Sequence, residues 1–309
     1  MLRRVSAKHI YICSPSSAVR DKAAVRRGIK RLQALGHDVE VDPDAFTSHM
    51  RFAGDDATRL AAIHRAASSG ADIVVTTRGG YGLTRLLPAI RYPLLKKAVD
   101  KGTQFVGLSD FTALNCALFA QAKATSWQGP AVGEDLGAEE PDEIMLDCFE
   151  DLVEGRGEGS GWRLPAAEAQ SRFREARGVL WGGNLAIIAS LVGTPWLPKV
   201  RGGILFLEDV GEHPYRIERM LTQLLHAGVL AQQKAILLGQ FTNWRPVPHH
   251  DKGFKMATVV AWLRSQVKIP VLTDLPFGHV PTKVLLPFGV PVHLAVDGRD
   301  AYVVWGHRH

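Results

Sequence analysis

Short apolar runs alternate in the first half of the chain with longer segments that carry apolar residues at helical spacing. Residues 9–13 form an apolar run, and a turn-forming stretch of serine and proline follows it. Val25, Ile29 and Leu32 then recur at the spacing of one helix face, which predicts a helix over residues 20–35. A glycine ends this helix and a new apolar run begins at Val39, so the pattern predicts strand, helix and strand in succession.

The same order of elements continues to about residue 122. A helix over 56–68 precedes a strand over 72–76, and a strand over 104–107 leads into another helix. Strands that alternate with helices are typical of a doubly wound parallel α/β sheet, whose functional groups gather at the carboxyl ends of the strands.

The pattern changes after residue 155. Residues 156–178 are rich in glycine and polar side chains and predict a linker between an N-terminal domain (1–155) and a C-terminal domain (179–309). The second half has two expected helices, over 214–227 and 254–266. Its shorter apolar runs predict strands near 204–207, 235–238, 270–275, 284–286, 292–296 and 301–305. We therefore expect a smaller, mixed α+β second domain.

Composition agrees with a folded two-domain protein. The chain has 309 residues, 46% of them hydrophobic, and its net charge of +6 comes from interspersed basic and acidic residues. Basic residues gather near the start, from Arg3 and Arg4 to Arg31. Because they share this stretch with an apolar helical stripe and no aromatic side chains interleave them, they predict a solvated helix face and no nucleic-acid partner.

Three widely separated cysteines, Cys13, Cys116 and Cys148, argue against a disulfide framework and favour a reducing compartment. The apolar run near the start is too short for a signal peptide, which needs about 7–15 apolar residues, or for a membrane span, which needs about 20. The expected location is therefore the cytoplasm, with no membrane partner.

Ser109 lies where a buried strand ends and a helix begins. This position presents a hydroxyl at the carboxyl edge of the sheet, beside backbone N–H groups that can stabilise an oxyanion. The segment lacks the last glycine of the G-x-S-x-G elbow, and a serine that only caps the helix is the competing interpretation.

A serine nucleophile needs a base and an acid that orients the base. His279 follows a glycine at the end of an apolar segment and is the candidate base. Glu208, Asp209 and Glu212 all follow the apolar run 204–207, and spacing alone does not choose among them.

The glycine-rich loop Arg78-Gly-Gly-Tyr-Gly82 lets the backbone approach a ligand closely. Its N–H groups could complete an oxyanion hole or hold a phosphate. However, neither of the nucleotide-binding motifs G-x-x-x-x-G-K-[ST] and G-x-G-x-x-G is present.

These segments together resemble the LD-carboxypeptidases (muramoyltetrapeptide carboxypeptidases), a family of serine peptidases. The shared blocks occur in family order over most of the chain, and Leu108 and Phe288 are minor departures. The blocks are Arg78-Gly-Gly-Tyr-Gly82, Gly107-Leu-Ser-Asp110, Trp181-Gly-Gly-Asn-Leu185, Gly193-Thr-Pro195, Leu207-Glu-Asp209, Glu212-His-Pro-Tyr-Arg216 and Phe277-Gly-His279.

The resemblance implies a triad of Ser109 as nucleophile, His279 as general base and Glu208 as orienting acid. It also implies a flavodoxin-like first domain, an active site at the domain junction, a homodimer, and no metal or other cofactor. The implied reaction occurs in the cytosol during peptidoglycan recycling, where the enzyme releases the terminal D-alanine of a murein tetrapeptide by cutting an L–D peptide bond.

Further residues are candidates for contacts with the substrate. The backbone N–H groups of Gly80 and Asp110 are expected to form the oxyanion hole. An exopeptidase must read a free carboxylate, for which Arg78, Arg85 and Arg216 are candidates, each with a structural ion pair as the alternative. Tyr81, Trp181 and Asn184 are expected near the cleft, and Trp181 is equally suited to core packing.

Three other functions are compatible with parts of the pattern. Relatives of the family hydrolyse peptidyl-nucleotide antibiotics and give self-immunity. A non-catalytic ligand-binding module would explain the glycine-rich loop and the alternating strands, and would leave the three triad residues as a coincidence. A metallohydrolase could use His249, His250 and Asp251, although adjacent histidines in a proline-flanked loop are usually only solvated.

Overall fold

The computed structural model describes residues 7–168 and 173–306. Five parallel strands of the first sheet lie in the order β2-β1-β3-β4-β5. This is the flavodoxin-like strand order, so the predicted doubly wound α/β domain is confirmed. The strands are β1 (His9–Cys13), β2 (Asp38–Val41), β3 (Ile73–Thr76), β4 (Gln104–Gly107) and β5 (Ser126–Gln128).

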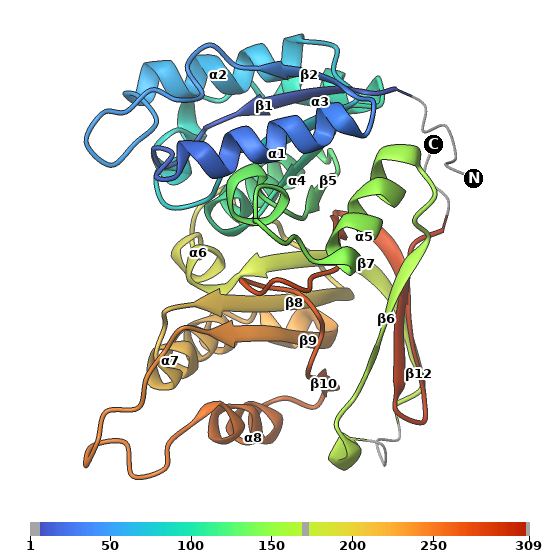
Figure 1. Ribbon diagram of the computed structural model, residues 1–309. Coiled ribbons are helices and arrows are strands. Elements are labelled where there is room, and N and C mark those ends of the chain that lie inside the picture. Colours follow the sequence, from blue (N-terminus) through green and yellow to red (C-terminus); the bar gives the residue numbers. More distant parts are fainter. Residues whose placement is uncertain (1–6, 169–172, 307–309) are drawn as a thin grey trace.

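Helices cover both faces of this sheet (Figure 1). One face packs against α1 (Lys22–Ala34) and α5 (Glu143–Glu154), and the other packs against α2 (Asp56–Ser68), α3 (Tyr92–Asp100) and α4 (Thr112–Ala122). Asp21 and Asp55 cap the first two helices by accepting the backbone N–H groups of Ala24 and Thr58. The expected bounds of α2 match the observed ones, whereas α3 and α5 were not anticipated.

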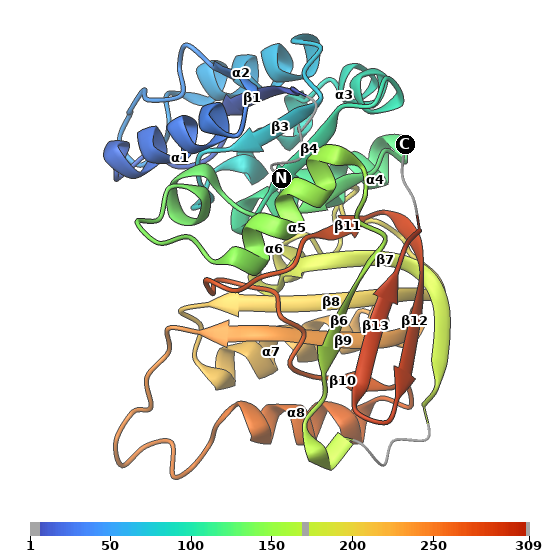
Figure 2. The same ribbon diagram turned by 45° about the vertical axis from the view of Figure 1, so that its right-hand side comes forward.

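A second, seven-stranded sheet lies below the first, in the order β10-β9-β8-β7-β12-β13-β6 (Figure 2). The strands β7 to β10 run parallel, and β12, β13 and β6 continue the sheet, each antiparallel to the strand before it. The strands are β6 (Gly159–Arg163), β7 (Glu175–Asn184), β8 (Gly203–Val210), β9 (Gln233–Thr242), β10 (Val271–Leu272), β12 (Val290–Asp297) and β13 (Asp300–Val304). Three helices accompany this sheet: α6 (Leu185–Ser190), α7 (Pro214–His226) and α8 (Met256–Gln266).

The segment 156–178, expected to be a linker, contains β6 and the first residues of β7. Part of it, residues 169–172, lies outside the described residues, as do Arg3 and Arg4. Within the described ranges, no helix combines the length and the apolar character that a membrane crossing requires.

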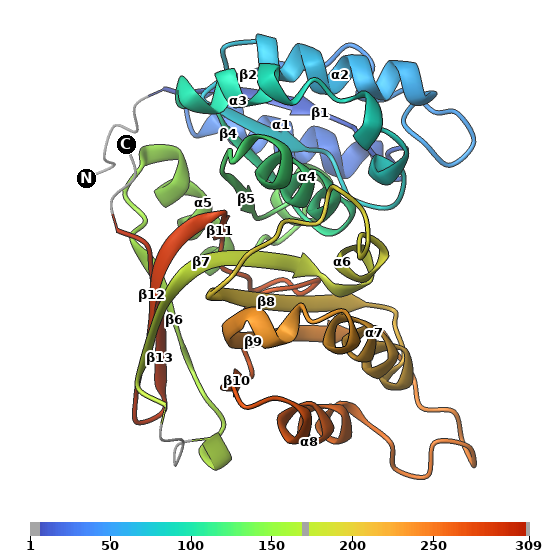
Figure 3. The ribbon, with the colours of Figure 1, turned by 180° about the vertical axis from the view of Figure 1, so that it is seen from behind.

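One strand from the second half of the chain belongs to the first sheet. β11 (Leu286–Phe288) pairs antiparallel with β5 at the edge of that sheet, beneath α4 (Figure 3). The chain then passes straight into β12, which pairs with β7 in the second sheet. The two sheets are therefore joined by a continuous run of paired backbone.

Candidate active site

Ser109 occupies a strained turn between β4 and α4. Its φ of +65° lies in the left-handed region, which residues other than glycine rarely adopt, and such conformations cluster at functional sites. Gly79 approaches it so closely that a Cβ there would stand 2.6 Å from the Ser109 Cβ. At Gly107, a Cβ would stand 2.4 Å from the Phe111 ring. The glycines before and beside the turn therefore make room for a hydroxyl at the end of a buried strand.

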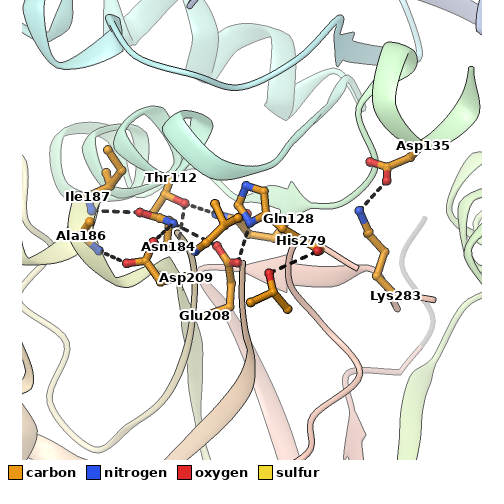
Figure 4. A network of polar contacts seen from close by, with 12 residues as sticks. Thr112, Gln128, Asp135, Asn184, Ala186, Ile187, Glu208, Asp209, His279 and Lys283 are labelled. Atoms are coloured by element: carbon orange, nitrogen blue, oxygen red, sulfur yellow. Dashed lines mark hydrogen bonds and ion pairs between the residues drawn. The ribbon is translucent and has the colours of Figure 1, made fainter. Parts of the chain in front are cut away.

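His279 is held by Glu208. The Nδ1 atom of His279 lies 2.7 Å from Oε2 of Glu208, whose side chain is fully buried (Figure 4). This contact favours the tautomer with the proton on Nδ1, and it leaves Nε2 free to accept another proton. Burial alone lowers the pKa of His279, but the hydrogen bond and the charge of Glu208 outweigh it, so the pKa is raised above its ordinary value.

The three acids that follow the apolar run 204–207 have different partners. Of these three acids, only Glu208 makes a hydrogen bond or ion pair with His279 among the described residues. The Asp209 carboxylate accepts the backbone N–H groups of Ala186 and Val210, and burial together with the neighbouring Glu208 charge raises its pKa to about 6. Glu212 pairs with Arg216 at the surface, 3.6 Å away. The geometry therefore favours Glu208, of the three, as the candidate for the orienting acid.

Asn184 links these groups to the helix that follows the nucleophile. Its side-chain amide donates to Glu208 Oε1 (3.2 Å) and to Asp209 Oδ1 (2.9 Å), and its backbone N–H donates to the Thr112 hydroxyl (3.1 Å) (Figure 4). Gln128 donates to the same hydroxyl at 2.9 Å. Asn184 was expected near substrate. It is instead buried and hydrogen-bonded to Glu208, and it does not line the pocket described next.

Ser109 and His279 line one pocket of about 630 Å³ between the two sheets. This volume is within the range of small-molecule sites. No hydrogen bond joins the two side chains in the described part of the chain, and such contacts are often long until substrate binds. The other lining residues are Arg20, Arg78, Gly79, Gly80, Leu108, Glu134, Asp135, Ala138, Glu140, Asp142, Met145, Val210, Asn243, Val280, Pro281 and Lys283.

The glycine-rich loop forms one wall of this pocket. Arg78 contacts Glu134 at 3.4 Å, and its buried Nη1 atom has no hydrogen-bond partner among the described residues. Gly80 has a φ of +113°, and a Cβ there would stand 2.2 Å from the Ser17 hydroxyl oxygen. This hydroxyl accepts the Tyr81 N–H at 3.0 Å. The loop thus places a guanidinium and a close backbone next to Ser109.

Asp110 turns its side chain away from the pocket. Its buried carboxylate accepts the Ser16 hydroxyl (2.7 Å) and the Leu83 N–H (2.9 Å), and burial raises its pKa. It thereby ties the nucleophile turn to the loop after β1 and to the end of the glycine-rich loop. Its backbone N–H remains the candidate oxyanion donor, together with that of Gly80.

Several residues singled out from the sequence lie elsewhere. Trp181 is fully buried and donates its indole N–H to Gln233, so the structure supports core packing instead of a cleft position. Tyr81 is 45% exposed and packs against Phe52 outside the lining of the pocket. Arg85 pairs with Asp56, 2.9 Å away, and this is the structural alternative considered for it.

Sequence reasoning did not find Asp135 and Lys283, which face the pocket as a buried ion pair. A lysine inside the apolar run 280–288, four residues after His279, was the available signal. Among the described residues, no group of three or more His, Cys, Asp or Glu side chains is placed to hold a metal ion. Asp251, a candidate ligand of the metallohydrolase alternative, accepts the Val247 N–H and lies 2.9 Å from the His213 ring.

Comparison with known proteins assigns the family. Residues 10–129 match the LD-carboxypeptidase N-terminal domain, and residues 177–294 match the LD-carboxypeptidase C-terminal domain. The crystal structure of muramoyltetrapeptide carboxypeptidase from Oxalobacter formigenes is 37% identical, with a TM-score of 0.85 over 96% of this chain and 98% of that one. The murein tetrapeptide carboxypeptidase of Pseudomonas aeruginosa is 29% identical over 286 residues, which are 91% of each chain.

A more distant structure shares the fold. The microcin C7 self-immunity protein MccF is 21% identical, with a TM-score of 0.85 over 99% of both chains. The two domain matches together cover most of the described residues, and they include Ser109, Glu208 and His279. The chain therefore belongs to the LD-carboxypeptidase family and is a serine-type LD-carboxypeptidase.

Proposed function

We propose that this carboxypeptidase releases the terminal D-alanine of murein tetrapeptides with Ser109, His279 and Glu208 as its catalytic triad. The observation that carries the proposal is the hydrogen bond between a buried carboxylate and His279 in the pocket that also holds Ser109. The names of the relatives from Oxalobacter formigenes and Pseudomonas aeruginosa support the substrate. Release of D-alanine inside the cytoplasm would serve peptidoglycan recycling.

In the first half of the reaction, the Ser109 Oγ attacks the carbonyl carbon of the L–D peptide bond as Nε2 of His279 takes the hydroxyl proton. Glu208 stabilises the imidazolium that forms. The bond to the D-alanine nitrogen then breaks, and His279 gives its proton to this leaving amine. In the second half, His279 takes a proton from a water molecule as it attacks the acyl carbon. The bond between this carbon and Ser109 Oγ then breaks, and His279 returns the proton to Oγ.

Two further roles complete the proposal. The N–H groups of Gly80 and Asp110 are the candidates to stabilise the tetrahedral oxyanion, and losing one such donor typically costs about 2.7–4 kcal/mol of barrier lowering. The Arg78 guanidinium, with one nitrogen buried and unpaired among the described residues, suits the carboxylate of the departing D-alanine. Arg216 is 50% exposed and does not line the pocket, so it is the weaker candidate.

The direct test uses the tetrapeptide L-Ala-γ-D-Glu-meso-diaminopimelate-D-Ala with the wild-type protein and Ser109→Ala, and mass spectrometry detects free D-alanine. We expect release by the wild type alone, and no release from a control peptide that ends in L-alanine. Release by Ser109→Ala at the wild-type rate would remove Ser109 from the mechanism.

If neither protein releases D-alanine although both are folded, peptidyl-nucleotides are the next substrates to test. MccF has been solved in complex with glutamyl sulfamoyl guanosine, and its similarity here extends over the whole fold. Hydrolysis of such a compound would keep the triad and change the substrate. Light scattering after size-exclusion chromatography would test the homodimer that we also propose.

A further inference from the structure

A buried ion pair spans the domain junction beside the proposed triad. Lys283 Nζ lies 2.5 Å from Asp135 Oδ1, and the two side chains are only 3% and 7% exposed (Figure 4). Both residues line the pocket that holds Ser109 and His279. They are 148 positions apart in the sequence, so the contact joins two distant parts of the chain.

Asp135 is fixed on the side of the nucleophile. It lies in a short π-helix, η4 (Val132–Leu136), and its second carboxylate oxygen accepts the Ala131 N–H at 2.8 Å. The Gly133 N–H in the same turn donates to the Thr77 carbonyl at 2.9 Å, directly before Arg78. The Asp135 carboxylate is therefore held in register with the glycine-rich loop and, through Gly79, with Ser109.

Lys283 is fixed on the side of the base. The Val284 N–H donates to the Pro276 carbonyl at 2.8 Å, which closes a loop that contains His279. The neighbouring Thr282 hydroxyl donates to Asp142, also a residue of the first half of the chain. The strand β11 begins three residues after Lys283 and joins the first sheet. The loop that carries His279 is thus attached to Glu208 at one point and to the first domain at several others.

A buried ion pair is a poor general means of stabilising a fold, because the loss of hydration offsets the attraction of the charges. Its well-attested use is to specify register, since a directional contact rejects the shifted arrangements that apolar packing tolerates. Here the register concerned is that of the base relative to the nucleophile. A shift of about 1 Å in such an arrangement can cost a hundredfold in rate.

We propose that Asp135 and Lys283 are positioning residues, and that their ion pair sets the His279 loop against the domain that carries Ser109. The inference rests on the proposed triad but not on the identity of the peptide substrate. Neither residue exchanges a proton with substrate in this role.

The first test measures the rate at which a fluorophosphonate labels Ser109, which reports activation of the serine whatever the natural substrate is. For Lys283→Met we expect labelling to slow by about 10-fold to 100-fold. For tetrapeptide hydrolysis we expect kcat to fall by a similar factor while KM changes less than about threefold. The matched control is Arg264→Met, which breaks an ion pair to the similarly buried Glu168 away from the pocket and should leave labelling unchanged.

The second readout is the pH dependence of labelling. The groups that act on His279 are Glu208 and Glu134, whose charges raise its pKa, and Lys283, whose charge lowers it. On the acidic side of the profile, where the labelling rate falls as His279 takes up a proton, Lys283→Met should therefore shift the fall to higher pH. Lys283→Arg should leave this acidic limb of the profile in place. A role limited to stability would lower the melting temperature and leave both the limb and the labelling rate of the folded protein unchanged.

Asp135→Asn is the second variant if Lys283→Met does not fold, because it removes the charge and keeps the shape of the side chain. Its one amide oxygen can accept from Lys283 or from the Ala131 N–H, but not from both. We expect its labelling to slow by about threefold to tenfold. Wild-type labelling rates in the folded variants would overturn the proposal. A wild-type protein that releases no D-alanine but is labelled at Ser109 would refute the substrate alone. A wild-type protein that is not labelled at all would refute the triad and this inference together.

Discussion

Glu208→Gln is the substitution whose effect on catalysis follows most directly from the structure. The change keeps the shape of the side chain and replaces a carboxylate by an amide, which has one oxygen and one NH₂ group. Asn184 already donates its amide N–H to Glu208 Oε1. In the variant, the oxygen of the new amide must accept this N–H, so the NH₂ group must face Nδ1 of His279.

This orientation forces the wrong tautomer on the base. Nδ1 would have to accept a hydrogen bond from the amide N–H, and the ring proton would then sit on Nε2, the atom that should receive the Ser109 proton. In serine proteases the corresponding loss of the correct tautomer lowers kcat by about 10⁴-fold. That factor corresponds to about 5 kcal/mol of transition-state stabilisation, and we expect a loss of this order here.

The assay compares kcat for D-alanine release by the wild type and Glu208→Gln, with circular dichroism as a check on folding. A double variant, Asn184→Ser with Glu208→Gln, supplies the control. Serine keeps an oxygen at the N-cap of α6 but removes the donor that fixes the amide, so the introduced glutamine can turn its oxygen toward Nδ1. We expect the double variant to recover at least about tenfold over Glu208→Gln.

The reasoning would be refuted if Glu208→Gln alone kept more than about a tenth of the wild-type kcat, because the tautomer would then matter little. A double variant no more active than Glu208→Gln would show that Asn184 does not determine the orientation of the amide.

Three further predictions concern the same pocket. Gly79→Ala should lower kcat by at least about a hundredfold, because the new methyl group would lie 2.6 Å from the Ser109 Cβ. The control is Gly36→Ala, which has open space around it and a φ of +95°, and which should lower only the free energy of unfolding, by about 1 kcal/mol in chemical denaturation. The raised pKa of His279 means that its neutral, basic form is lost as pH falls through a value above the ordinary ~6.5, so kcat/KM should decline below neutral pH, and a profile flat from pH 5 to 8 would contradict a histidine base. Arg78→Ala should raise KM for the tetrapeptide at least about tenfold with a smaller change in kcat, and an unchanged KM would assign the substrate carboxylate to another group.

The sequence predicted elements whose signal is local. The helix α2 has a capping Asp55 and a regular apolar face, and it was expected at its observed bounds. The strand β6 was missed because its sequence, Gly-Ser-Gly-Trp-Arg, has neither an apolar run nor a strict alternation. It is an edge strand that pairs with β13, and its Trp162 packs into the core of the second sheet. The residues of β6 themselves carry no signal that a strand about 140 positions later will pair with them.

The site divides in the same way. Ser109 and His279 each follow a recognisable break between a strand and its loop, and family blocks surround them. The choice of Glu208 over its neighbour Asp209 depends on which way each carboxylate turns at the end of β8, and this is a matter of tertiary contacts. The block that contains Trp181 suited a substrate contact and core packing equally, and its indole packs in the core. The sequence block therefore showed that a tryptophan is suited to this position, but not whether it packs in the core or contacts substrate.

The insertion of β11 into the first sheet affects how this protein can be made. When β5 leaves the ribosome, its outer edge has no partner until Leu286–Phe288 follows, about 160 residues later. At synthesis rates of about 5–20 residues per second, that edge waits on the order of 8–30 s. An unpaired strand edge is a template for association with other chains. A nascent chain or a truncation that lacks β11 should therefore need chaperone protection, whereas a chain that includes β11 closes this edge with its own strand.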